Sequence, residues 1–366
     1  MKIAHIFNEL KFSGAEILLE SAAPYFLRDS EMTIISTGVS PGDFTGRLTK
    51  AGYVVEHIPF GSLNFYWRLR SFLLNGNFDA VHIHTERAAL AYSILARSIG
   101  LFSIRTIHNE FLFSGILRFR RILTRGIAQR FLGTIHVACS PSVQRNERKR
   151  FGVESVIINN WLDVSRIKAV SAADREKYRE IMGIGGEEIV TISISNESPA
   201  KNLETLFLSI IKLYNSGVNI RHYHCGNIGK SLESLARSSD GVIFPVGTIS
   251  DLNPYLAVSD ALISAAYNEG GPISLLEAAA AGVPIITTKV GLAELFEGQD
   301  AVKFFDPVVN SLVEAISGFS NENLSNRRNG QGRLVDFTRR YFDPRRGAEE
   351  YISLYKSNAK FDLEKK

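Results

Sequence analysis

The chain of 366 residues has little cysteine and no long apolar run. Its two cysteines, Cys139 and Cys225, lie far apart and form no metal-binding or redox motif, which excludes a disulfide scaffold and a cysteine-based zinc site. No stretch reaches the roughly 18 consecutive apolar residues of a transmembrane helix. The start, Met1 to Phe7, is a short apolar stretch rather than a signal peptide. We therefore expect a cytoplasmic protein.

Other absences narrow the function. The sequence lacks repeats of solenoid length and low-complexity tracts, which excludes a repeat protein. No Gly-x-Gly-x-x-Gly follows the first apolar segment, which argues against a dehydrogenase. The net charge is only +4, and no nucleic-acid-binding motif accompanies the basic residues, so we expect no nucleic-acid partner. Hydrophobic residues make up 45% of the chain, enough for sizeable cores.

Short apolar segments alternate with longer helix-like segments along the whole chain. This alternation predicts an α/β protein with parallel sheets covered by helices. The length suits about two domains of roughly 150 residues, and a polar stretch at 171–188 favours a boundary near residue 165. The predicted strands of the first half are 2–7, 32–36, 80–84, 103–107 and 136–139, and its predicted helices are 15–27 and 87–99. The second half restarts with a strand at 189–194.

Two glutamates, Glu269 and Glu277, lie in a segment that reads as strand, glycine loop and helix. The apolar run 261–265 precedes Gly270-Gly271, and Pro272 and Gly282 suit the start and the end of a helix. Glu269 is thus expected in the loop and Glu277 inside the helix. Two carboxylates at a helix N-terminus suit a ligand with sugar hydroxyls at its ends and phosphate in its middle. The alternative is a solvated glutamate on each element.

This segment resembles the E-x7-E motif of the retaining glycosyltransferases of family 4. The resemblance continues through Pro284 and Gly291-Leu292-Ala293-Glu294 and covers most of the chain. It implies the GT-B fold, in which two Rossmann-like domains face a cleft that holds the active site. The first domain would span residues 1–164, the second 165–339, and a C-terminal helix within 340–366 would cross back to the first.

The resemblance also implies residue roles in the second domain. Glu277 would bind the nucleotide ribose, and Glu269 would contact the donor sugar. Lys201 matches the lysine of the family's phosphate-binding segment, while Asn196 stands where the family has arginine. An amide cannot offer the charged fork of arginine, so Asn196 weakens the expected phosphate site. Backbone amides near Gly270 and Gly271 would help to neutralise the diphosphate.

In the first domain, the resemblance points to the loops after two strands. Gly14 lies in Ser13-Gly14-Ala15-Glu16, where the family has a glycine-rich loop that approaches phosphate; an ordinary turn glycine is the alternative. His108 ends a predicted strand and matches the family's active-site histidine, which hydrogen-bonds the donor sugar. His84 also ends a strand and is a weaker candidate, whereas His82 is expected to be structural.

The implied reaction moves a hexose from a nucleotide diphosphate sugar to a hydroxyl with retention of the anomeric configuration. No Asp-x-Asp triplet occurs, so we expect no metal, and the resemblance implies no cofactor. The acceptor would be a glycan or a lipid-linked glycan in surface polysaccharide or lipopolysaccharide synthesis. The alternatives are an inactive scaffold subunit, suggested by Asn196, and a sugar-nucleotide epimerase of the same fold, against which the E-x7-E motif argues.

Basic residues gather between Arg105 and Arg150, with ten Lys or Arg against two glutamates. Within this region, residues 111–125 mix large apolar side chains with arginine. Such a segment can lie in an anionic membrane interface, so we expect a peripheral protein at the inner face of the cytoplasmic membrane. The alternative is an amphipathic helix packed on its own domain. The sequence suggests that Arg118, Arg120, Arg121 and Arg125 can be replaced without loss of the fold.

Overall fold

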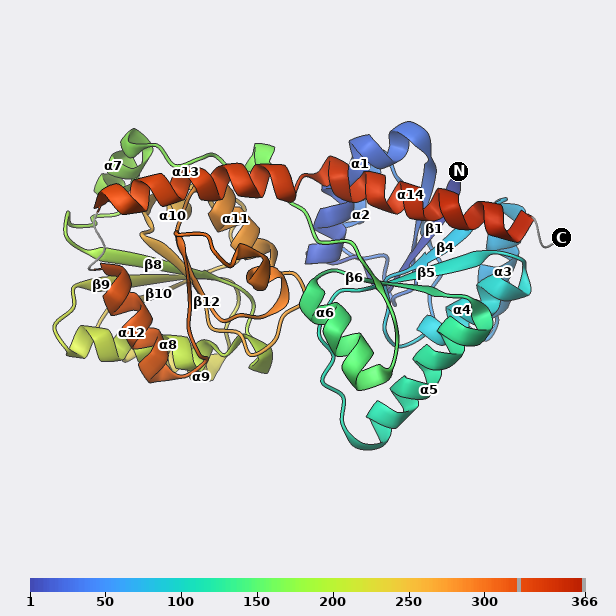
Figure 1. Cartoon of the computed structure of the whole chain (residues 1–366), viewed down its shortest axis with the longest axis horizontal. Helices are drawn as coiled ribbons and strands as arrows, with labels where there is room; N and C mark the ends of the chain where they lie inside the picture. Colours follow the sequence, from blue (N-terminus) through green and yellow to red (C-terminus); the bar gives the residue numbers. More distant parts are fainter. Residues whose placement is uncertain (321–323, 364–366) are drawn as a thin grey trace. The chain divides into compact units, whose positions relative to one another are not determined.

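A computed structural model describes residues 1–320 and 324–363 (Figure 1). The chain divides into two compact units. Unit 1 comprises Met1–Leu162 with Pro344–Lys366, and unit 2 comprises Asp163–Asp343. The sequence suggested boundaries at 164 and 339, whereas the structure has them at 162 and 343. Residues 364–366, which belong to the expected C-terminal region, lie outside the described residues.

Unit 1 contains a parallel sheet of seven strands in the order β3-β2-β1-β4-β5-β6-β7. Helices cover both faces of this sheet, so β1, β2, β4 and β5 are almost entirely buried, as parallel strands usually are. The strands are β1 (Lys2–Phe7), β2 (Glu31–Ser36), β3 (Val54–His57), β4 (Ala80–Ile83), β5 (Phe102–Ile107), β6 (Ile135–Ala138) and β7 (Val156–Ile157). The α/β class predicted from the alternation is confirmed.

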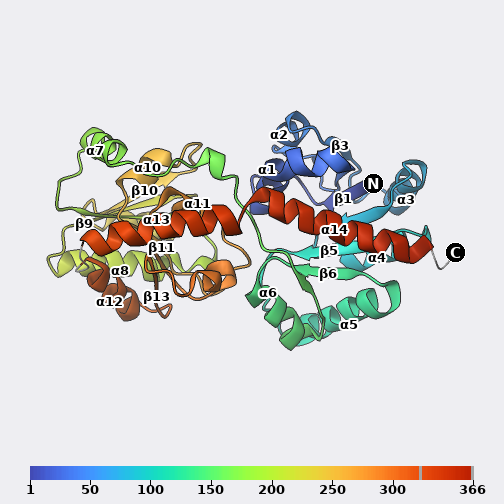
Figure 2. The ribbon, with the colours of Figure 1, turned by 45° about the horizontal axis from the view of Figure 1, so that its top comes forward.

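The helices of unit 1 lie in two layers, with α1 and α14 on one side of the sheet and α5 and α6 on the other (Figures 1 and 2). A π-helical turn, Glu147–Phe151, follows α6. The helices are α1 (Gly14–Asp29), α2 (Thr45–Lys50), α3 (Phe65–Asn75), α4 (Ala89–Ser98), α5 (Gly115–Leu132), α6 (Pro141–Asn146) and α14 (Pro344–Leu363).

The C-terminal helix α14 packs against α1, so the last part of the chain returns to the unit that contains the first. Trp161 fixes this contact, since its indole Nε1 donates to the carbonyl of Leu18 and to Ser21 Oγ, both at 3.0 Å. Gly347 of α14 lies against the Trp161 ring, and a Cβ at this position would collide with it. The expected return of the C-terminal helix to the first domain is therefore observed within unit 1.

Unit 2 contains a second parallel sheet, in the order β10-β9-β8-β11-β12-β13. Its strands are β8 (Ile189–Ile194), β9 (Ile220–Cys225), β10 (Ile243–Gly247), β11 (Ala261–Ser264), β12 (Ile285–Thr287) and β13 (Val302–Phe304). Its helices are α7 (Ala172–Ile181), α8 (Leu203–Asn215), α9 (Lys230–Arg237), α10 (Asn253–Val258), α11 (Ile273–Ala281), α12 (Val309–Ser320) and α13 (Leu324–Tyr341). Apolar residues of α8, α12 and the strands form the core on one face.

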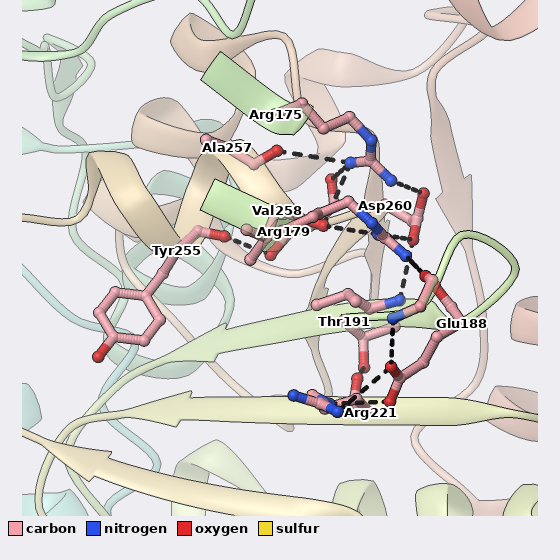
Figure 3. A network of polar contacts seen from close by, with 12 residues as sticks. Arg175, Arg179, Glu188, Thr191, Arg221, Tyr255, Ala257, Val258 and Asp260 are labelled. Carbon is pink, nitrogen blue, oxygen red and sulfur yellow. Dashed lines mark hydrogen bonds and ion pairs between the residues drawn. The ribbon is translucent and has the colours of Figure 1, made fainter. Parts of the chain in front are cut away.

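Two arginines of α7 attach this helix to the rest of unit 2 (Figure 3). Arg175 donates to the carbonyls at the end of α10 and to Asp260 Oδ1 at 2.7 Å. Arg179 donates to the carbonyls of Val258 and Glu188. Asp260 also accepts the backbone N–H of Val190, the second residue of β8, at 2.9 Å. The polar stretch 171–188 is thus an anchored helix and its following turn rather than a loose linker.

Candidate functional site

In unit 2, the predicted binding residues gather at the carboxyl ends of β8, β9 and β11. The loops that follow β8 and β11 contain the predicted residues Asn196 and Glu269, and the loop after β9 contains Gly226, which is not among the predicted site residues. Open parallel sheets bind their ligands at this edge, because successive loops leave the sheet side by side there. The order β9-β8-β11 makes the three strands neighbours.

Lys201 and Glu269 form an ion pair between Nζ and Oε1. Lys201 ends a 3₁₀ turn, Pro199–Lys201, and the backbone N–H of Tyr267 donates to the carbonyl of Ala200 at 2.8 Å, which holds the two loops together. Glu269 is buried, whereas Lys201 is partly exposed. The sequence pointed to both residues, but it did not indicate that they pair.

Glu277 lies inside α11, as the sequence predicted, and Glu269 lies in the loop before it. Burial raises the pKa of the Glu277 carboxyl to about 7, because desolvation disfavours its charged form. Within the described part of the chain, the Glu277 carboxyl makes no hydrogen bond. Its proximity also contributes to the raised pKa of Cys225. Such a carboxyl can accept hydrogen bonds from ligand hydroxyls.

Close backbone contacts between the loops depend on glycines other than the two that the sequence emphasised. Neither Gly270 nor Gly271 adopts a positive φ, so neither position requires the left-handed backbone conformation that favours glycine. Gly291 has φ +63°, and a Cβ there would lie 2.8 Å from the carbonyl oxygen of Gly270. At Gly226, φ is +140°, and a Cβ would collide with the carbonyl of Ser195. Only glycine fits both positions.

Asn196 connects two loops of the site. Its Oδ1 accepts the backbone N–H of Asn227 at 3.0 Å, while Glu197 accepts the N–H of Gly229. The amide thus acts as an acceptor towards its own chain and supplies no positive charge. Lys230, at the start of α9, is exposed beside this loop.

In unit 1, three histidines form a chain of hydrogen bonds across adjacent strands. His5 Nδ1 lies 3.0 Å from His84 Nε2, and His84 Nδ1 lies 3.0 Å from His108 Nε2. Burial lowers the pKa of His5 to about 3 and that of His108 to about 4, so the imidazoles are neutral at pH 7. His84, the weaker sequence candidate, is therefore the link between the other two.

The environment of His5 indicates which ring nitrogen carries the proton in each of these three histidines. Its Nε2 is buried and has no hydrogen-bond partner. A buried N–H without an acceptor is rarer than a buried acceptor without a donor, so His5 carries its proton on Nδ1 and donates to His84. His84 then donates from Nδ1 to His108 Nε2. His108 consequently carries its own proton on Nδ1, where it is available to a ligand.

The nitrogens of His5, His82 and His84 lie within 4.8 Å of one another, a grouping that could hold a metal ion. The hydrogen bonds argue against it. His82 contacts Tyr355 Oη at 2.6 Å and Thr106 Oγ1 at 2.7 Å, so both its nitrogens are engaged. Its ring also stacks on His84, with centroids 4.1 Å apart, which turns the rings away from a common tetrahedral centre.

Gly14 is the first residue of α1 and is exposed. Glu16 of the same first turn accepts hydrogen bonds from Ser13 Oγ and from the backbone N–H of Lys11. Burial raises the pKa of Glu16. A phosphate near Gly14 would therefore have a carboxyl group for a neighbour, a feature that the sequence motif did not reveal.

The structure groups the predicted residues by unit. Gly14 and His108 belong to unit 1, while Asn196, Lys201, Glu269 and Glu277 belong to unit 2 with Gly270 and Gly271. Comparison with known proteins shows which family this arrangement represents. Residues 12–166 match the domain described as Glycosyltransferase Family 4, and residues 187–321 match the domain described as Glycosyl transferases group 1. The chain belongs to the family 4 type of glycosyltransferases.

A curated relative of this glycosyltransferase is the putative teichuronic acid biosynthesis glycosyltransferase TuaC of Bacillus subtilis strain 168. The two are 23% identical over 192 residues, which are 52% of this chain and 48% of TuaC. The chain thus matches about half the length of the curated relative.

Solved structures show that the glycosyltransferase has the GT-B fold. A glycosyltransferase from Rickettsia africae has a TM-score of 0.83 at 18% identity, over 97% of this chain and 98% of that one. Anabaena HepE in complex with UDP has a TM-score of 0.84 at 19% identity, over 98% and 100%. WaaG, a glycosyltransferase involved in lipopolysaccharide biosynthesis, has a TM-score of 0.75 at 17% identity, over 95% and 98%.

Proposed function

We propose that the protein transfers a hexose from a nucleotide diphosphate sugar to a hydroxyl group of a glycan or lipid-linked acceptor, with retention of configuration. The observation that carries this proposal is the set of groups at one edge of the unit 2 sheet. These are the partly exposed but desolvated carboxyl of Glu277, for which the described residues provide no hydrogen-bond partner, and the Lys201–Glu269 ion pair. The family match and the UDP-bound structures of HepE support it.

Each group has a distinct task in this proposal. Glu277 accepts hydrogen bonds from the ribose hydroxyls, which compensate a buried carboxylate for its lost hydration. Glu269 accepts a hydroxyl of the donor sugar, and Lys201 faces the diphosphate. Charge develops on the leaving diphosphate during transfer, and a fixed cation stabilises it. In unit 1, His108 offers its Nδ1 proton to a hydroxyl of a bound substrate. No metal or cofactor takes part in this scheme.

A donor panel tests the proposal directly. Uridine, guanosine and adenosine diphosphate sugars would be titrated calorimetrically, and hydrolysis or transfer would be followed for those that bind. We expect one nucleotide class to bind and Lys201→Ala to reduce turnover at least tenfold with smaller loss of nucleotide affinity. Full activity of Lys201→Ala would show that the phosphate site is elsewhere. The Glu233→Ala variant, which changes an exposed residue of α9, serves as a control.

A second candidate function is a scaffold subunit that binds a nucleotide sugar without turning it over. Asn196 favours it, because its amide is bonded to Asn227 and supplies no charge to a diphosphate. The same donor panel separates the two functions. Binding without hydrolysis or transfer, with turnover gained in Asn196→Arg, would identify the scaffold.

We also propose that the protein works at an anionic membrane surface in polysaccharide or lipopolysaccharide synthesis. The support comes from α5, whose apolar residues recur at helical spacing on the exposed face. Ile116 is 89% exposed, Phe119 62% and Phe131 77%. Arg118 and Arg130 are exposed on the same helix, and such a combination suits an interfacial helix. No helix among the described residues is long and apolar enough to span a membrane.

The structure corrects one expectation about this segment. Arg121 and Arg125 do not face solvent: Arg125 pairs with Glu147 at 2.7 Å, and both arginines contact Glu86. Replacing all four arginines would therefore break a buried ion-pair network, which costs about 3–5 kcal/mol when one partner is removed. A membrane test has to use the exposed arginines only.

A further inference from the structure

A pocket of about 380 Å³ opens in unit 1 between α4, α5 and the sheet, with the loop after β4 at its edge. Its lining is strongly basic, with five arginines against one glutamate, Glu86. Arg105 comes from β5, and its register neighbour His136 comes from β6. Arg120, Arg121 and Arg125 come from α5, and Arg87 comes from the loop after β4. None of the residues to which the family resemblance gave a role lines this pocket.

The buried part of this arginine cluster contains more positive than negative charge. Arg105, Arg121 and Arg125 share Glu86, and Arg125 also pairs with Glu147. Three guanidinium groups thus face two carboxylates. Buried charges are stable only when they are paired, so one positive charge is left for a ligand to balance. Burial lowers the pKa of Arg105, and repulsion from Arg125 and Arg121 adds to this effect.

Several donors in the cluster have no acceptor. Nε of Arg105 and one terminal nitrogen of Arg125 (Nη1) are buried and form no hydrogen bond. Neither ring nitrogen of His136 forms one either, and in the neutral imidazole one of the two is an N–H donor. These three side chains are each at most 3% exposed, and all three line the pocket. Buried polar groups without partners are uncommon in native proteins. Their concentration at one pocket indicates that a ligand supplies the missing acceptors.

Two further arginines line the pocket and are not paired with a carboxylate in the described residues. Arg87 and Arg120 are exposed, line the pocket and form no ion pair in residues 1–320 and 324–363. Phe60 and Tyr66, both half-exposed, complete the wall beside them. Guanidinium groups bind the oxygens of phosphate bidentately. Aromatic rings at the same wall can pack against the apolar face of a sugar ring or a similar group.

We propose that this pocket is a phosphate-binding site of unit 1 that takes a phosphorylated sugar or the phosphate headgroup of a lipid. Phosphate supplies the acceptor oxygens that Arg105, Arg125 and His136 lack, and its charge balances the excess of arginine. The pocket is larger than a single phosphate group requires, which leaves space for the attached group against Phe60 and Tyr66. The site does not depend on glycosyl transfer, so binding can be measured without a donor.

The test compares two variants of equal charge on the same unit. Arg87→Gln/Arg120→Gln changes the two exposed arginines of the pocket, whereas Arg68→Gln/Arg70→Gln changes two exposed arginines of α3 that do not line it. Inorganic phosphate, a hexose 6-phosphate and the uncharged hexose are titrated by calorimetry. A shift of the His136 ring signals by NMR on addition of phosphate locates the site.

We expect the phosphorylated sugar to bind and the uncharged hexose not to bind, with affinity at least tenfold weaker in the pocket variant and unchanged in the control. A lipid source is distinguished with vesicles that contain phosphatidylglycerol, compared with vesicles whose equal negative charge comes from fatty-acid carboxylates. If the wild-type protein binds the phosphatidylglycerol vesicles more tightly than the fatty-acid vesicles and the pocket variant does not, the ligand is a lipid phosphate. Equal effects of both variants on every probe, or no binding of any phosphate probe, would overturn the proposal. Intact nucleotide binding in the same samples would show that such a failure leaves the proposed transfer function untouched.

Discussion

At the scale of single residues, Glu277 illustrates how burial prepares a side chain for a ligand. Glu277 of α11 is partly exposed, but the fold desolvates its carboxyl without giving it a hydrogen-bond donor in the described part of the chain, and its pKa rises to about 7. Ionisation of such a carboxyl lowers the stability of the folded protein, because the carboxylate lacks hydrogen bonds. Hydroxyl groups of a bound ligand supply these hydrogen bonds and stabilise the carboxylate. Its environment therefore agrees with the ribose-binding role that the E-x7-E resemblance implies.

We predict that nucleotide affinity depends on the ionisation of Glu277. With a pKa of about 7, the carboxylate fraction rises from about one tenth at pH 6 to about nine tenths at pH 8, so the apparent affinity should rise about tenfold. Calorimetric titrations at several pH values measure this. In Glu277→Gln, titrated with the same nucleotide, the part of the pH dependence of affinity that is caused by the Glu277 carboxyl should disappear. An identical pH profile in both proteins would remove Glu277 from the site.

The same raised pKa predicts an effect on stability. The folded state binds the Glu277 proton more tightly than the unfolded state, whose pKa is about 4.5. The free energy of unfolding should therefore fall as the pH rises from about 4.5 to about 7. Glu277→Gln should abolish this decrease and be more stable than the wild type at pH 8. Urea denaturation at pH 5 and pH 8 compares the two proteins, and a variant less stable at pH 8 would contradict the assignment.

His84 is predicted to position His108 rather than to touch the substrate. It donates to His108 Nε2 and thus keeps the proton of His108 on Nδ1. In His84→Phe, we expect the ¹⁵N signals of His108 to show a change of tautomer and kcat to fall about tenfold, with a smaller change in KM. His84→Gln retains an N–H donor and should preserve the tautomer. If His84→Phe leaves the His108 signals unchanged, the chain of imidazoles has only a structural role.

At the scale of elements, α5 has two faces with different tasks. Its inner face contributes Arg121 and Arg125 to the network with Glu86 and Glu147. Cation–π contacts add to this, since the Arg125 guanidinium lies 4.1 Å from the centre of the Phe151 ring. The outer face exposes apolar side chains and arginines. The helix is therefore anchored by charge and exposes hydrophobic groups, the reverse of an ordinary surface helix.

We predict that the outer face of α5 binds anionic vesicles. Each basic residue near such a surface contributes about 1 kcal/mol, so Arg118→Gln/Arg130→Gln should weaken binding roughly 30-fold, and salt should weaken it further. Phe119→Ser/Phe131→Ser should weaken it as well through loss of apolar insertion. Co-sedimentation with anionic and neutral vesicles measures both. Lys168→Gln/Lys177→Gln removes two exposed charges from unit 2 and serves as the control, which should bind normally.

At the scale of the whole molecule, buried histidines are unevenly divided between the two units. Unit 1 contains five histidines with lowered pKa values, and unit 2 contains two. Those of unit 1 are His5, His82, His84, His108 and His136, and those of unit 2 are His222 and His224. Burial is the main cause in every case. Three carboxyls of unit 1 with raised pKa values, Glu16, Glu147 and Glu350, oppose their effect.

We predict that acid unfolds unit 1 before unit 2. A histidine whose pKa is lower in the folded state contributes stability that is present above the unfolded pKa of 6.5 and is lost as the pH falls below it. Both tryptophans, Trp67 and Trp161, belong to unit 1, so their fluorescence reports that unit alone, whereas far-UV circular dichroism reports both.

The fluorescence transition should therefore occur at a higher pH than the main change in circular dichroism. Trp67→Phe keeps the buried Trp161 as the reporter and serves as the control. Coincident transitions by both methods would contradict the prediction.

Local chemistry made much of the architecture predictable from the sequence. The alternation of apolar runs and amphipathic segments indicated the parallel sheets, and the strand at 189–194 coincides with β8. Gly282, expected to end the helix, does so with φ +77°. Glu269 in the loop and Glu277 in the helix were equally predictable. These features depend on residues that are close in the sequence, where period and turn propensity decide the outcome.

Contacts between distant residues were decided only by the tertiary structure. Lys201 meets Glu269 across 68 positions, and His84 meets His5 across 79. The spacing of arginines in α5 was visible in the sequence, but which of them point inward depended on Glu86 and Glu147, which lie on other segments. A charge pattern fixes which side chains share a helical face, whereas burial and pairing depend on what the fold places opposite that face. The sequence by itself therefore determined the family, the α/β architecture and the positions of the two glutamates, and the tertiary structure decided which charges are paired and which remain available to a ligand.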